Sequence, residues 1–163
     1  MKFRILSLTE QEIFGVDVMA TFDYTDVAAL GAVTTGNIAL LPGTTNGLQP
    51  AAGVNGTDTL PAAFAVKFKY LIVDTAFVSS TAAGLSLTVG DSGSATRHLA
   101  GTQLQAGQTP VAGATGITNE YYVPAAIATN AYLTSTTANL NTFTSGQARL
   151  FFSSKDLNQL PKA

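Results

Sequence analysis

Apolar and polar residues alternate along most of the chain, which is the period of a β-strand, whereas the three-to-four-residue spacing of an amphipathic helix is scarce. Residues 14–22 predict the first clear strand. We expect its apolar positions to share the face that packs in the core: Phe14, Val16, Val18, Ala20 and Phe22.

The strongest strand pattern covers residues 64–77. Strict alternation places Lys67 and Lys69 on one face of this strand. The opposite face carries five apolar residues: Phe64, Val66, Phe68, Tyr70 and Ile72. Every residue from 70 to 73 is apolar, so the lysine-bearing face must become covered there by a sheet edge, a loop or a neighbouring subunit. The length of the strand predicts a bend or bulge near Asp74.

Residues 85–89 also alternate and predict the next strand, which we expect to lie beside the preceding one and to end in a turn at residues 90–93. Further strands are expected at 37–41, 121–123, 131–135 and 147–152. The last of these should point Ala148, Leu150 and Phe152 inward. The one predicted helix covers residues 94–105, with Ser94 as its N-cap.

Short strands separated by turns, with no βαβ rhythm, predict an all-β protein: an antiparallel β-sandwich, with a jelly roll as the expected topology. The sandwich should occupy residues 14–153, with an extended N-terminal arm at 1–13 and a C-terminal tail at 154–163. Turn-rich stretches at 43–57 and 106–119 predict long loops. One domain is expected from the length of 163 residues.

The predicted arm is more apolar than a solvated tail should be. It therefore docks on a neighbouring subunit or on its own domain, the alternative being disorder. We predict that its apolar side chains form the oligomer or capsid contacts: Phe3, Ile5, Leu6, Leu8 and Ile13.

Charged residues make up only 11% of the chain, less than half of the roughly 25% typical of soluble proteins, and the net charge is −2. Small uncharged residues take the place of charged ones, and their side chains lose little conformational entropy when a surface is covered. This composition suits surfaces buried in an assembly and predicts an oligomer. The few basic residues form no cluster, so nucleic-acid binding is not expected. No signal peptide or membrane-spanning run is recognised, and the absence of cysteine excludes disulfides and thiol catalysis.

One short motif resembles an active site. Residues 90–93, Gly-Asp-Ser-Gly, match the surroundings of the nucleophile in trypsin-like proteases, but the only histidine, His98, follows on the same segment. A tight turn explains these residue types without catalysis. No other pairing of chemical groups suggests a reaction, and we predict a protein that is not an enzyme, with no catalytic residues.

Ligand and metal motifs are equally sparse. His98 has no cysteine or second histidine to complete a transition-metal site, and a calcium site using Asp23 with Asp26, or Asp91, is a weaker alternative to ordinary turn aspartates. The glycines form no nucleotide-binding motif. Tyr121 and Tyr122 would suit sugar stacking, but core and interface positions explain them as well. We therefore predict no cofactor and no metal.

A wider resemblance covers approximately residues 64–152. Val-Asp-Thr-Ala-Phe at 73–77, Leu-Ser-Leu-Thr-Val-Gly-Asp-Ser at 85–92, the Arg-His-Leu segment at 97–99 and the ending at 146–152 together resemble phage head decoration proteins. The resemblance implies a jelly-roll cement protein of a tailed bacteriophage, displayed as homotrimers on the outer surface of the capsid, where it bridges major capsid proteins. It implies no membrane partner and no catalytic residue.

Two other functions remain open from the sequence. One is a receptor-binding or carbohydrate-binding β-sandwich of a phage tail fibre or spike, which would use loops at 43–57 or 106–122. The other is a small major coat protein, which would assemble shells by itself.

Overall fold

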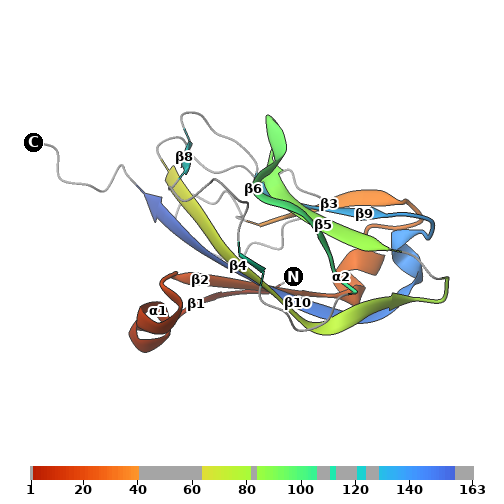
Figure 1. The fold of residues 1–163 in the computed structure, drawn as a ribbon, viewed down its shortest axis with the longest axis horizontal. Coiled ribbons are helices and arrows are strands. Elements are labelled where there is room, and N and C mark those ends of the chain that lie inside the picture. The colour runs from red at the N-terminus through yellow and green to blue at the C-terminus, as the bar shows by residue number, and fades with distance from the viewer. Residues whose placement is uncertain are drawn as a thin grey trace, which may run out of the picture.

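The computed structural model describes residues 2–40, 64–81, 84–105, 111–112, 121–123 and 129–156 (Figure 1). Most of them lie in strands. The elements are, in chain order, β1 (Lys2–Ile5), α1 (Leu8–Phe14), β2 (Val18–Asp23), α2 (Tyr24–Ala28), β3 (Thr35–Ala39), β4 (Phe64–Ser79), β5 (Leu85–Asp91), β6 (Ser94–Gln103), β7 (Val111–Ala112), β8 (Tyr121–Val123), β9 (Thr129–Ser135), the 3-10 helix η1 (Leu140–Thr142) and β10 (Phe143–Asp156).

The strands form two antiparallel sheets. One sheet has the order β1-β2-β10-β4-β7, with β8 also pairing β4, and the other has the order β3-β9-β5-β6. Pairing is nested along the chain: β2 pairs β10, β3 pairs β9, β4 pairs β7 and β8, and β5 pairs β6. The prediction of an all-β antiparallel sandwich is confirmed.

One apolar core lies between the two sheets. Val18, Leu71 and Leu150 reach it from the first sheet, and Leu87 and Leu133 reach it from the second. The inward face predicted for residues 147–152 is confirmed, since Ala148, Leu150 and Phe152 are buried in this core. The face predicted for residues 14–22 is confirmed only for Val18, Ala20 and Phe22, because Phe14 and Val16 lie before β2 and pack in a separate apolar cluster.

A bulge at Lys69 corrects the predicted faces of β4. Phe151 pairs with Tyr70 and Phe152 with Phe68, so Lys69 is an extra residue that reverses the alternation. Phe68 therefore faces the core, whereas Tyr70 and Ile72 face outward, contrary to the sequence prediction. A second shift makes Asp74 the extra residue between the partners of Gln147 and Ala148, and this bulge was predicted.

The prediction of a helix at 94–105 is wrong. Residues 94–103 form β6, which pairs with β5 across a two-residue turn at Ser92 and Gly93. Buried Leu99 and Leu104, which suggested a helical face, instead point into the core from the strand and its end. β5 also does not lie beside β4 as expected, because the two strands belong to opposite sheets.

The first strand begins later than predicted. Phe14 ends helix α1, and β2 starts only at Val18. Residues 2–5 form β1, which pairs with β2 in the sheet, so this part of the predicted arm lies against its own domain. At the other terminus β10 continues to Asp156, beyond the predicted end of the sandwich. The predicted loop at 43–57, most of that at 106–119 and the tail after Asp156 lie outside the described residues.

Candidate interaction surface at the N-terminal helix

Helix α1 is inserted between the paired strands β1 and β2 and lies at the end of the sandwich (Figure 1). Ser7 caps its first turn: the Ser7 hydroxyl accepts from the Glu10 backbone N–H, and the Glu10 carboxylate accepts from the Ser7 N–H in return. At the other end Gly15 adopts the left-handed conformation, φ 63°, and donates its N–H to the Gln11 carbonyl oxygen. A helix of seven residues therefore has both ends satisfied.

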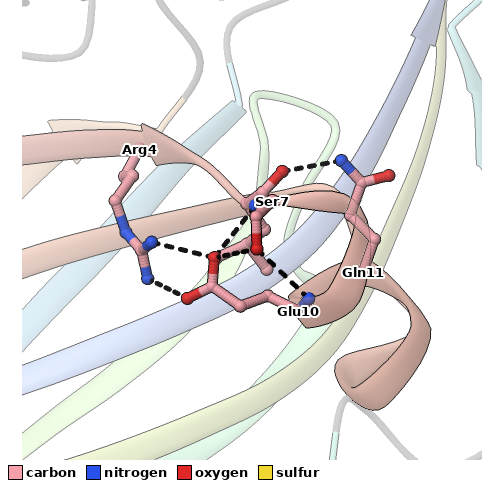
Figure 2. Close-up of polar contacts among 5 residues, drawn as sticks. Arg4, Ser7, Glu10 and Gln11 are labelled. Carbon is pink, nitrogen blue, oxygen red and sulfur yellow. Dashed lines mark hydrogen bonds and ion pairs between the residues drawn. The ribbon is translucent and has the colours of Figure 1, made fainter.

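Two side-chain contacts connect the helix to the residues before it, one to β1 and one to Leu6 (Figure 2). The Arg4 guanidinium donates to both Glu10 carboxylate oxygens, at 2.9 and 2.7 Å. Gln11 Nε2 donates to the Leu6 carbonyl oxygen at 2.7 Å. The hydrogen bonds from Arg4, and then those from Ser7, lower the pKa of Glu10 to about 2. Glu10 is thus a carboxylate at any pH near neutral, and its hydrogen bonds connect the first turn of the helix to β1.

The inner side of this segment packs on the outer face of the first sheet. Phe14 lies against Phe151 of β10, with ring centroids 5.1 Å apart. Leu6, Val16 and Phe151 are buried there and form a second apolar cluster, separate from the main core. The cluster provides the cover that the apolar run at 70–73 requires, because Tyr70 and Ile72 also pack against it.

The outer side of α1 is exposed. Leu8 is 78% exposed and Ile13 is 71% exposed, the two highest values among the large apolar side chains that are exposed in the described part of the chain. Two large apolar side chains exposed on one short helix make this surface a candidate contact surface. We call Leu8, Ile13 and the exposed Glu12 between them the α1 face.

The five predicted contact residues separate into three groups. Leu8 and Ile13 are exposed and available to a partner, whereas Leu6 is 2% exposed and belongs to the interior. Phe3 and Ile5 lie on edge strand β1, and their side chains are outside what is described. The sequence missed the anchoring role of Phe14, although the Ser-x-x-Glu spacing at residues 7–10 is a capping signal that predicts a helix start.

The Gly-Asp-Ser-Gly motif forms the tight turn expected of it. The carboxylate of Asp91, the buried last residue of β5, accepts from the backbone N–H groups of Gly93 and Ser94 and pairs with Arg97. Burial opposes the ionisation of Asp91, but these hydrogen bonds outweigh it and lower its pKa. Burial lowers the pKa of neighbouring His98 to about 4, so the imidazole is neutral near pH 7.

The candidate calcium aspartates are engaged in helix capping. The Asp23 carboxylate accepts from the Thr25 hydroxyl and from the N–H groups of Thr25 and Asp26, while Asp26 accepts from the Asp23 N–H. The Thr25 hydroxyl is the main cause of the lowered pKa of Asp23. Among the described residues, no group of three or more His, Cys, Asp or Glu is placed to hold a metal ion.

Comparison with known proteins returns no match: no family model, curated protein or solved structure matches the chain. Within the described ranges, no helix has the length and apolar character needed to cross a membrane.

Proposed function

We propose that this chain is a structural protein of a virus particle, a decoration or cement protein that stabilises a bacteriophage head by bridging major capsid proteins from the outside. The observation that carries the proposal is the α1 face, where Leu8 and Ile13 are exposed on a helix that is capped at both ends and packed on the sheet through Phe14. Covering such side chains releases free energy in proportion to the apolar area removed from water.

We further propose that the sandwich is a jelly roll. The nested pairs β2–β10, β3–β9, β4–β7/β8 and β5–β6 support this, because a long antiparallel hairpin rolled into two sheets produces such nesting. The strand order of both sheets is consistent with the same rolling. The resemblance of residues 64–152 to head decoration proteins points to this topology independently.

In this function the N-terminal segment acts as the arm. It pairs through β1 with its own sheet and presents the α1 face to a neighbour, either another copy in a homotrimer or a capsid subunit. The low charge of the chain favours this use, since few ions must be desolvated when its surfaces are covered. Many weak contacts on one shell add by multivalency, so no catalytic step is required.

Co-sedimentation with purified heads tests the proposal. We expect the unmodified chain to saturate heads that lack it, and the double variant Leu8→Ser/Ile13→Ser to lose most of that occupancy. Val78→Ser is the matched control, because Val78 is also exposed but lies near the far end of β4. Equal occupancy for the double variant and the control would remove the α1 face from the mechanism, and no binding by the unmodified chain would refute the function.

A further inference from the structure

The outer face of the second sheet differs in chemistry from that of the first. Leu87, Val89, Leu133 and Ile38 point into the core, so the residues between them on β5, β9 and β3 face outward. β3 and β9 contain no charged residue, and the only one in β5 is buried Asp91. The fourth strand, β6, carries Arg97, which is paired with the Asp91 carboxylate. By contrast, the outer face of the first sheet carries charged side chains, Arg4 and Arg149 among them.

The outward side chains of the second sheet form rows that run across the strands. Asn37 pairs directly with Tyr132, and Tyr132 pairs directly with Thr88. The neighbouring row contains Thr35, Thr134 and Ser86, which are paired in the same way. Hydroxyls and an amide therefore lie beside a single half-buried aromatic ring on β9, an inner strand of the sheet.

The row formed by Asn37, Tyr132 and Thr88, called the Tyr132 row, has open space at its Thr88 end. Exposed Gly101 of β6 lies next to Thr88, and a side chain carbon added there would meet only the Thr88 methyl group, at 3.9 Å. Adjacent strands are about 4.8 Å apart, which is close to the length of one pyranose unit. Three successive units of a sugar chain laid across the strands would therefore pass Asn37, Tyr132 and Thr88.

We propose that this face binds a neutral oligosaccharide, with one sugar ring stacked on Tyr132 and the hydroxyls of its neighbours bonded to Asn37 and Thr88. Electrostatic complementarity favours this ligand. The two rows on β3, β9 and β5 carry no charge and therefore gain little from a charged partner, whereas their hydroxyls and amide match the donors and acceptors of an uncharged sugar. The site is distinct from the loops at 43–57 and 106–122 that the sequence suggested for sugar binding.

A second protein copy is the competing occupant. The low charge of the face suits a protein partner as well as a sugar, but the face lacks the large apolar side chains that protein interfaces need at their centre. Interface centres are rich in large apolar and aromatic side chains and poor in serine. The large apolar residues that are exposed in the described ranges lie outside β3, β9, β5 and β6: Leu8, Ile13, Tyr24, Val33 and Val78. Tyr132 alone supplies aromatic area here, which suits one stacked ring better than a protein interface.

Calorimetric titration of the full chain tests the proposal. The probes are neutral hexasaccharides of β-linked glucose, mannose and galactose, with polygalacturonate as a charged comparison. We expect at least one neutral probe to bind, Tyr132→Ala to weaken it about tenfold or more, and Tyr132→Phe, which keeps the ring, to weaken it at most about fivefold. Tyr24→Ala, which removes a partly exposed tyrosine on α2, should change nothing.

Four results would overturn the proposal: no heat with any neutral hexasaccharide, equal or tighter binding of polygalacturonate, unchanged binding by Tyr132→Ala, or a change in oligomer mass caused by Tyr132→Ala. The last of these would assign the face to a second copy. The unfolding midpoint of each variant shows whether it is folded under the conditions of the titration. If Tyr132→Ala is unstable, Tyr132→Phe still tests whether the aromatic ring is sufficient for binding. Head occupancy is measured separately, so failure here leaves the α1 face untouched.

Discussion

The ring of Phe14, at the end of α1, lies 5.1 Å from the ring of Phe151 on β10, with 36° between their planes. This contact joins the N-terminal helix to the middle of the first sheet across most of the sequence. We expect Phe14→Ala to detach α1 and to cost about 2 kcal/mol, less than a fully buried phenylalanine because Phe14 is half-buried. Urea unfolding measures the cost, and Leu8→Ala, which removes an exposed side chain of α1, is the control.

The N-cap of α1 provides a separate prediction. Ser7→Ala removes the acceptor for the Glu10 N–H and should destabilise the segment by about 1 kcal/mol, which is the usual effect of losing a serine cap. Amide hydrogen exchange should then quicken in residues 8–14 and stay unchanged in β9. Uniform acceleration over the whole chain would contradict the account, because it would mean that α1 unfolds only with the sandwich.

Acid should weaken the β5–β6 hairpin through His98. The pKa of His98 is about 4 in the folded chain and near 6.5 in the unfolded chain. Between pH 4 and 6.5 the imidazole is therefore protonated in the unfolded state and neutral in the folded state. Stability therefore falls as pH drops from 6.5 to 4, by at most about 3 kcal/mol. Loss of the Asp91 carboxylate, whose pKa is lowered, adds to this at still lower pH.

Urea unfolding at a series of pH values measures this effect, with His98→Gln as the comparison. The free energy of unfolding of the variant should fall much less between pH 6.5 and 4. Below pH 4 it should fall as it does in the unmodified chain. An equal slope in both proteins would mean that His98 is not the group responsible.

Gly146 supports a close approach between β10 and β4. Its φ of 135° is unfavourable for other residues, and an added side chain carbon would collide with the Phe77 ring and lie 2.8 Å from the Phe77 Cα. We expect Gly146→Ala to cost more than about 2 kcal/mol and to lower the thermal midpoint. Gly31→Ala is an informative comparison, since Gly31 also has a positive φ but open space around it, and it should cost less.

Local patterns predicted the fold where alternation is regular and failed where the backbone breaks it. Val18, Ala20 and Phe22 were correctly assigned to the core. The bulge at Asp74 was also predicted correctly. The bulge at Lys69 has no strong sequence signal, because lysine fits either a strand face or an extra residue, and so the faces of Tyr70 and Ile72 were predicted wrongly.

The two candidate sites also differ in how far the sequence could predict them. Leu8 and Ile13 were predicted because apolar residues in a terminal segment are conspicuous. The Tyr132 row could not be predicted, since Asn37, Tyr132 and Thr88 come from three strands far apart in sequence and meet only through the sheet register. The mistaken helix at 94–105 arose because Leu99 and Leu104 are spaced irregularly where β6 departs from regular pairing with β5.

The central claim is that an assembly partner covers the α1 face. The chain has no cysteine, so Leu8→Cys introduces a single thiol whose alkylation rate can be measured in the free chain and in heads that carry it. The account predicts labelling at least about tenfold slower on the head at Leu8→Cys and unchanged labelling at the exposed control Val78→Cys. Equal labelling rates for Leu8→Cys in the free and head-bound chain would contradict the claim.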